Sequence, residues 1–158
     1  MRKIIIRKVL QSDAYSLSCN IFPKSTVYEV EEQLKESLKG MKEGKLIHLV
    51  AIYEDSVVGN IKIIKQQHIL YSHRCMVMDM IVSPSFQKMG IAKSLFEEGC
   101  KFSQELNFNY VMATCRGDGT EKFYKAIGMN ECGRIPNGIY EPWSKNIYDE
   151  IILCKELE

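Results

Sequence analysis

The chain has 158 residues, a formal net charge of +1 and a hydrophobic fraction of 46%. This length fits one domain over residues 1–158, and a domain of this size buries enough surface to fold without crosslinks. The charge balance lacks the basic excess of a nucleic-acid-binding protein. No apolar run approaches the roughly 18 residues of a membrane span, and the basic N-terminal segment lacks a signal peptide's apolar core and cleavage site. We therefore expect a cytoplasmic protein with no nucleic-acid and no membrane partner.

Six cysteines are present, and none forms a Cys-x-x-Cys pair. Most lie in apolar runs, which favours buried, reduced thiols over disulfides. The three histidines show no ligand spacing to these cysteines, so we expect no metal site. The cysteines are Cys19, Cys75, Cys100, Cys115, Cys132 and Cys154.

The N-terminal half contains short apolar strands and two predicted helices. Ser12-Asp13 offers an N-cap for the first helix, and the sequence from Thr26 to Glu29 reads as a capping box for the second. A polar tripeptide, Glu54-Asp55-Ser56, separates two β-rich runs and predicts a hairpin. The predicted elements are a strand over 4–9, helices over 12–21 and 27–41, and strands over 46–53 and 57–64.

The C-terminal half begins with an apolar run, Arg74 to Val82, that reads as a central strand ending at Ser83-Pro84. A helix from Gln87 to about Asn107 follows, and then a buried strand over 110–115. Next we predict a short helix with Phe123 and Ile127 facing the core and Gly128 as its C-cap. The tail holds strands near 132–134 and 148–154, separated by an aromatic loop over 135–146. The strand–helix–strand unit over 74–115 implies one parallel pair in a hairpin-rich sheet, which is a mixed α+β class.

Two motifs point to chemistry. Gln87-x-x-Gly90-x-Ala92 places small residues where a strand gives way to a helix. Small residues let a ligand approach the backbone, and the free N–H groups of a first helical turn attract phosphate oxygens. Lys88 and Lys93 add positive charge there, so a pyrophosphate is the expected ligand. The second motif, Phe123 to Met129, reads by itself as a capped amphipathic helix.

Together, in this order, the two motifs resemble those of the GNAT superfamily of acyl-CoA N-acyltransferases. The first matches its Q/R-x-x-G-x-G/A loop, Val82-x-Pro84 matches the strand end before that loop, and residues 123–129 are similar to its F-Y-x-x-x-G-F segment. The resemblance implies a GNAT-like fold, with a mostly antiparallel sheet of six or seven strands flanked by about four helices. It also implies that the strands over 74–82 and 110–115 splay apart to admit acetyl-CoA.

The resemblance also implies roles for individual residues. Backbone groups of Ile81 and Val82 would pair with the pantetheine arm, and Tyr124 would reach the thioester sulfur. The pyrophosphate would be held by the loop and first helical turn, which comprise Gln87, Lys88, Met89, Gly90, Ile91, Ala92 and Lys93.

The attacking amine must first lose a proton, so a base or a water path to one is useful. Asp79 is our candidate, because it is the only charge in the run from Cys75 to Val82, and a buried carboxylate is costly unless it is paired or functional. The alternative is an ion pair with a lysine or arginine of a neighbouring helix. Many family members carry a glutamate where this chain has Met76, and others carry Glu-Asp where it has Met78-Asp79. Gly117 also replaces an asparagine that is often found there.

Asp149, Glu150 and Tyr140 are candidate acceptor-binding residues. The two carboxylates open the last predicted strand and would attract a cationic substrate, while Tyr140 belongs to the aromatic loop that could wall the same pocket. The alternatives are solvated strand-edge charges and a surface loop packed over the sheet end. We expect Met76, Met78 and Met80, which alternate on one strand face, to lie in the core.

These inferences predict an acetyl-CoA-dependent N-acetyltransferase that acts on a primary amine, favouring a small molecule. The amine would attack directly in a ternary complex, without an acetyl-cysteine intermediate, because no cysteine has a visible partner base. One alternative is an enzyme that acetylates a protein or peptide. A second is a non-catalytic acyl-CoA sensor, which the missing glutamate at Met76 motivates. A homodimer is compatible with pairing of the terminal strands across a two-fold axis.

Overall fold

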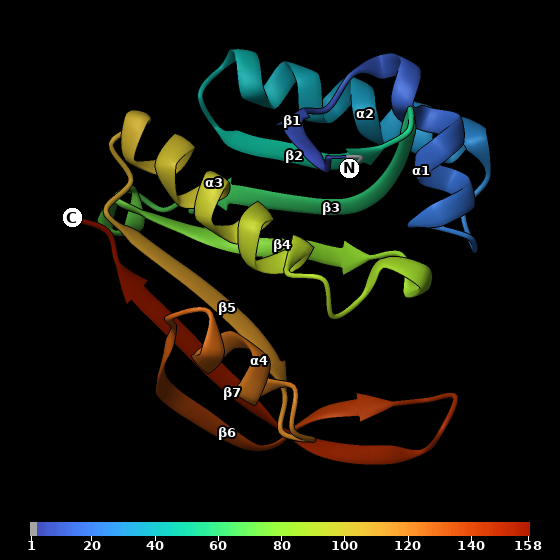
Figure 1. Ribbon diagram of the computed structural model, residues 1–158. Helices are drawn as coiled ribbons and strands as arrows, with labels where there is room; N and C mark the ends of the chain where they lie inside the picture. Colours follow the sequence, from blue (N-terminus) through green and yellow to red (C-terminus); the bar gives the residue numbers. More distant parts are fainter. Residues whose placement is uncertain (1–2) are drawn as a thin grey trace.

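The computed structural model describes residues 3–158. Its strands form one seven-stranded sheet in the order β1-β2-β3-β4-β5-β7-β6 (Figure 1). Neighbouring strands are antiparallel except β4 and β5, which are parallel, as the strand–helix–strand unit predicts. The strands are β1 (Ile5–Lys8), β2 (Leu46–Tyr53), β3 (Ser56–Lys65), β4 (Arg74–Val82), β5 (Tyr110–Arg116), β6 (Asn130–Glu141) and β7 (Asn146–Glu156).

Helices cover both faces of the sheet. The short α1 (Ala14–Asn20) and the longer α2 (Val27–Lys42) pack on one face, over β2 and β3. The opposite face carries α3 (Ile91–Glu105) over β2, β3 and β4, and α4 (Glu121–Ala126) over β6 and β7 (Figure 1). The mixed α+β architecture predicted from the sequence is therefore confirmed. Within residues 3–158, none of the helices is long and apolar enough to cross a membrane.

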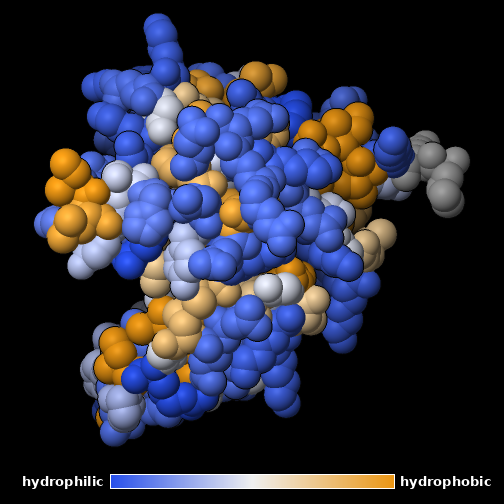
Figure 2. Space-filling view, turned by 90° about the vertical axis from the view of Figure 1, so that its left-hand side faces the viewer, coloured by the Kyte–Doolittle hydropathy of each residue, from blue (hydrophilic) through white to orange (hydrophobic). Residues whose placement is uncertain are grey.

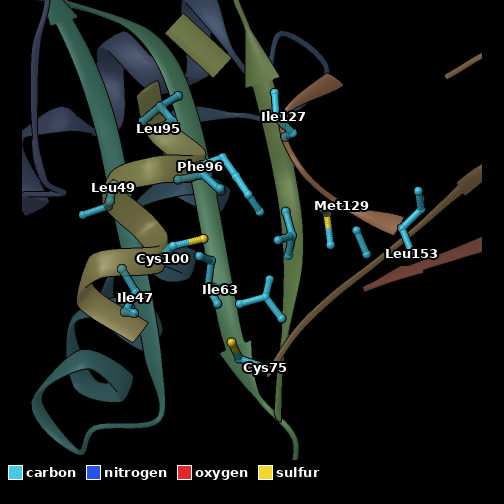
Figure 3. Close-up of a cluster of buried hydrophobic side chains, with 14 of the residues drawn as sticks. Ile47, Leu49, Ile63, Cys75, Leu95, Phe96, Cys100, Ile127, Met129 and Leu153 are labelled. Atoms are coloured by element: carbon cyan, nitrogen blue, oxygen red, sulfur yellow. The ribbon is translucent and has the colours of Figure 1, made fainter. Parts of the chain in front are cut away.

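Two hydrophobic clusters correspond to the two faces. The larger lies between α3 and the sheet, and Figure 3 shows Leu95, Phe96 and Cys100 of α3 facing residues of β2, β3 and β4. The same cluster continues to Ile127 and Met129, so it joins the two halves of the sheet. The smaller cluster packs α1 and α2 on the other face, with residues including Leu17 and Leu34.

Three helix details differ from the predictions. The helix expected from Gln87 begins at Ile91, because a 3₁₀ turn follows Pro84 and Gly90 adopts a left-handed conformation at the N-cap. Asp13 is the N-cap residue of α1, as predicted, but its side chain makes no cap hydrogen bond to that helix. Its carboxylate instead accepts hydrogen bonds from both terminal guanidinium nitrogens of Arg7, at 2.8 and 2.9 Å. Phe123 does not face the core and is 39% exposed. Ile127, the C-cap residue of α4, is buried as predicted.

The predicted aromatic loop over 135–146 is wrong. Strands β6 and β7 form a long hairpin whose connection covers only 142–145. Register shifts after Glu131 and after Ile135 interrupt the alternation that marks a strand, and Pro136 and Gly138 lie in the second irregularity. Both residues suggest a turn when the sequence is read alone.

The expected burial of methionines and cysteines is only partly found. Met78 is 43% exposed, and Met76 and Met80 are half-buried. All six cysteines are free; Cys75 and Cys100 are buried, whereas Cys19 and Cys132 are exposed. The three methionines do not share one strand face: Met80 packs against the larger core cluster, whereas Met76 and Met78 line a separate surface hollow.

Candidate active site

The parallel strands β4 and β5 separate soon after they meet. They pair at only three positions, Arg74–Tyr110, Cys75–Val111 and Met76–Met112, and Figure 1 shows them diverging beyond this point. Strand backbone groups without a ladder partner can pair with an extended ligand as they would with another strand. The expected splaying is thus present. Figure 2 views the molecule from the opposite end, where the two strands still pair, and shows hydrophobic side chains between its upper and lower parts.

A β-bulge lies in β4 beside this opening. Met78 is the register partner of Lys62 and Ile81 is that of Asn60, so β4 has one extra residue between these pairs. Asp79 adopts a left-handed conformation with φ of 50°. The side-chain amide of Asn60 donates to the Asp79 carbonyl oxygen at 2.9 Å. The carboxylate of Asp79 is therefore turned toward solvent. The prediction that it lies inside a buried strand is wrong.

The Asp79 carboxylate is 43% exposed and faces one lysine. Its Oδ2 atom lies 3.7 Å from Nζ of Lys62, whose side chain is only 14% exposed. The ion pair expected as the alternative therefore exists, but its lysine comes from the neighbouring strand β3 instead of a helix. Because the carboxylate is only partly covered, it can still meet a ligand on the open face of the sheet.

A cavity of about 330 Å³ lies where β4 ends and α3 begins. Sequence reasoning missed three of its lining residues, Met80, Phe86 and Phe123; for Phe86, the sequence offers only an aromatic residue beside Pro84. Ile81, Met89 and Tyr124 do not line the cavity: Ile81 packs toward α1 and α2, and Met89 is 62% exposed. The predicted residues brought together here are Val82, Gln87, Lys88, Gly90, Ile91, Ala92 and Lys93.

The cavity wall has the properties of an anion site. Gly90, with φ of 80°, turns the chain into α3, and a Cβ atom there would contact nothing within 4 Å. The first N–H groups of a helix have no intrahelical acceptor, and the helix dipole favours negative charge at this end. Nε2 of Gln87 donates to the Val82 carbonyl at 3.1 Å and fastens the loop to the strand end. With Lys88 and Lys93, this wall fits a pyrophosphate.

Tyr124 follows Phe123 in α4 but does not itself line the cavity. Its half-buried ring packs against the larger core cluster and meets the Phe123 ring edge-on, with centroids 5.4 Å apart. Burial, together with the nearby Cys115, raises the pKa of the Tyr124 hydroxyl. The hydroxyl is therefore protonated at neutral pH and can donate a hydrogen bond.

The cysteines near the site are poor nucleophiles. Burial, with a further contribution from Glu121 and Asp118, raises the pKa of Cys115. Burial also raises the pKa of Cys75 to about 12 and that of Cys100 to about 11. Since the thiolate is the reactive form, these thiols are largely inert at neutral pH.

The predicted acceptor residues lie on the β6–β7 hairpin and do not line the cavity. Asp149 lies within β7 and is already engaged: it accepts the backbone N–H of Asn137 at 3.0 Å and pairs with Arg134 at 3.1 Å, and these contacts lower its pKa. Glu150 is half-buried, and Tyr140 is 59% exposed. Glu141 on the same hairpin is buried and pairs with Arg116. Nothing in the sequence distinguishes that pair.

Comparison with known proteins agrees with this geometry. The profile of the acetyltransferase (GNAT) family matches residues 11–129. Among curated proteins, none matches the sequence. Solved structures match over almost the whole chain. A GNAT-family acetyltransferase from Streptococcus pneumoniae has a TM-score of 0.83 at 17% identity and covers 99% of this chain and 100% of its own.

Two further similar structures are those of acetyltransferases named after different substrates. A ribosomal-protein-alanine N-acetyltransferase from Brucella melitensis has a TM-score of 0.82 at 18% identity, covering 97% of this chain and 99% of its own. A phosphinothricin acetyltransferase from Sinorhizobium meliloti, in complex with AcCoA, has a TM-score of 0.81 at 16% identity, covering 98% and 88%. At these identities the likeness shows a shared fold. The matched profile spans most of the chain, so the chain belongs to the acetyltransferase (GNAT) family, the class of N-acetyltransferases that use acetyl-CoA.

Proposed function

We propose that residues 1–158 form one domain that transfers the acetyl group of acetyl-CoA to the primary amine of a small molecule, by direct attack in a ternary complex. The observation that carries this proposal is the opening between β4 and β5, which leads to the anion-binding cavity at the start of α3. An extended thioester arm and a pyrophosphate need these two features, in this order along the chain.

Different residues bind different parts of the cofactor. Backbone groups of Ile81 and Val82, beyond the last β4–β5 pair, hold the pantetheine arm. The loop and first turn from Gln87 to Lys93 hold the pyrophosphate with N–H groups and two lysines. Met89 contributes its backbone, since its side chain is exposed. A backbone N–H near Ile81 stabilises the negative charge that develops on the thioester oxygen.

Asp79 orients the acceptor amine and takes its proton, directly or through water. The bulge aims its carboxylate at the open face of the sheet, away from α3. A carboxylate at this place favours the approach of an ammonium ion, which must become neutral before it can attack. Lys62 keeps the carboxylate in place.

Tyr124 serves the leaving thiolate as a hydrogen-bond donor. A tyrosine with a raised pKa is a weaker acid than a thiol, so complete proton transfer to sulfur is unfavourable. Direct transfer, without an acetyl-cysteine intermediate, is supported by the raised pKa of Cys115.

A second hollow supports a compact acceptor. It lies on the open side of β4, has a volume of about 490 Å³ and includes Tyr71, Met76 and Met78 in its lining. The hollow is open to solvent, and its Tyr71 and Met78 side chains are exposed, so an amine could reach it from the surface. Because Met78 is adjacent to Asp79, an amine seated there lies next to the candidate base.

The test is a steady-state assay of CoA release with a panel of amines: amino acids, polyamines, amino sugars and a peptide with a free N-terminus. Turnover with a small amine, reduced in Asp79→Asn and Tyr124→Phe, is the expected result. Turnover with the peptide alone would replace the small-molecule acceptor with a polypeptide. Acetyl-CoA binding without turnover of any amine would favour the sensor instead.

A further inference from the structure

A chain of buried polar groups runs from α2 across strands β2 and β3 and ends at the β4 bulge. Ser37 on α2 contacts Nδ1 of His48 on β2 at 3.0 Å. Nε2 of His48 contacts Oδ1 of Asn60 on β3 at 2.6 Å, and Nδ2 of Asn60 donates to the Asp79 carbonyl at 2.9 Å. The side-chain residues are at most 3% exposed. The chain lies under α2, on the face of the sheet opposite α3.

The direction of every hydrogen bond in this chain follows from its last member. The Asp79 carbonyl can only accept, so the Asn60 amide group points toward it and the Asn60 oxygen points toward His48. The side-chain oxygen of Asn60 can likewise only accept a hydrogen bond, so Nε2 of His48 must carry the proton. Burial lowers the pKa of His48 to about 4, with Lys62 contributing in the same direction, so the ring is neutral at pH 7. Nδ1 therefore accepts a hydrogen bond from the Ser37 hydroxyl. No donor or acceptor in the chain has an alternative orientation.

The bulge needs this support because the sheet does not provide it. Asp79 has no register partner on β3, and a non-glycine residue with φ of 50° is strained. Asn60 holds β4 at two points: its backbone is the register partner of Ile81, and its side chain binds the Asp79 carbonyl. The residues between these two points carry the groups assigned above to the thioester oxygen and the acceptor amine.

We infer that Asn60 is a positioning residue for acetyl transfer: backed by His48 and Ser37, it fixes the β4 bulge so that the Asp79 carboxylate and the backbone N–H groups near Ile81 meet the reacting groups. This inference rests on the proposed function for its catalytic consequence. Its structural part, that Asn60 orders the bulge, stands separately and has its own measurement.

The principal variant is Asn60→Asp, which keeps the shape of the side chain; as a carboxylate it still accepts from His48 but has no N–H to donate to the Asp79 carbonyl. The control is Ser103→Ala. Ser103 is also fully buried on α3, where it donates to the Gly99 carbonyl at 2.8 Å and accepts from the Cys75 thiol at 3.9 Å, at the start of β4 and not at the bulge. Both variants change a fully buried, hydrogen-bonded side chain, but only Asn60 contacts the bulge, so faster exchange confined to residues 79–82 in Asn60→Asp reports position and not stability alone.

Two measurements are made on each full-length variant. Hydrogen exchange of the amides over residues 79–82 is expected to accelerate in Asn60→Asp and not in Ser103→Ala. The value of kcat for acetyl transfer is expected to fall by about 10²-fold in Asn60→Asp, because a displacement near 1 Å at the reacting groups costs about that much. The KM for acetyl-CoA is expected to stay near the wild-type value, because the pyrophosphate loop is unchanged. Should Asn60→Asp not fold, His48→Gln, which loosens the Asn60 amide, is expected to show smaller effects in the same direction.

The outcomes separate the two claims. Exchange and kcat that both match wild type in a folded Asn60→Asp protein would overturn the inference. A raised KM for acetyl-CoA at unchanged kcat would overturn it as well, because Asn60 would then act on cofactor binding. Faster exchange in Asn60→Asp, with a wild-type protein that acetylates no amine, would refute the proposed function and leave the ordering of the bulge established.

Discussion

The neutral His48 makes the stability of the fold sensitive to mild acid. In the folded protein burial lowers its pKa to about 4, and its ordinary pKa is 6.5. Between these values the unfolded chain binds a proton at His48 and the folded protein does not. The contribution of His48 to the free energy of unfolding is therefore fully present above about pH 6.5 and is lost as the pH falls toward 4.

The size of the effect follows from the two pKa values. Lowering the pH from 7 to 5 removes about 2 kcal/mol of the free energy of unfolding through this one residue. The carboxylate of Asp13, whose pKa is also lowered, contributes only at a more acidic pH. Burial of Asp13 opposes this shift, but the hydrogen bonds from Arg7 and the Leu10 N–H outweigh it.

The assay is urea unfolding of the wild type and of His48→Gln at pH 7, 6 and 5. With a urea slope of about 2 kcal/mol per molar, the wild-type midpoint should fall by about 1 M more than that of the variant. His68 and His73 are present in both proteins and cancel in the comparison. Equal falls in the two midpoints would show that His48 titrates normally in the folded state, and the argument from burial would be refuted.

Two further predictions concern the cofactor site. Tyr124→Phe should lower kcat by about 10²-fold, because the leaving thiolate loses its donor, while the thermal stabilisation by acetyl-CoA stays at the wild-type value; loss of that stabilisation would instead make Tyr124 a binding residue. Gly90→Ala should lower the free energy of unfolding by about 1 kcal/mol and weaken acetyl-CoA binding, because φ of 80° strains any side chain. Its control is Gly133→Ala, where a Cβ atom meets only ordinary contacts at 3.4 Å and beyond; equal effects on acetyl-CoA binding in a titration would count against the loop.

The parts of the fold that the sequence predicts are those whose signals are local. The hairpin of β2 and β3, the capped helix α2 and the central strand β4 each combine a regular apolar pattern with a nearby cap or turn. The β6–β7 hairpin could not be recognised because two register shifts break its alternation. A bulge inserts an extra residue and so shifts the two-residue alternation of a strand, and the local amino-acid composition does not show where this shift occurs.

The site shows the same division. The loop from Gln87 to Lys93 is contiguous in the sequence, and all of its residues except Met89 line one cavity. The support for Asp79 comes from Asn60, His48 and Ser37, which are far apart in the sequence and meet only across the sheet. A histidine in an apolar strand reads as an ordinary core residue, so neither its neutral state nor its link to the bulge could be predicted before the sheet register was known.

The most direct test of the account is thermal unfolding with and without acetyl-CoA, at about a hundredfold over a micromolar dissociation constant. Linkage then predicts a stabilisation of about 2.7 kcal/mol, which corresponds to a rise in Tm of about 5–10 °C for a domain of this size. Gly90→Ala should show a smaller rise under the same conditions. A folded wild-type protein whose Tm does not change would contradict the account, because the opening between β4 and β5 and the loop before α3 would then not form a cofactor site.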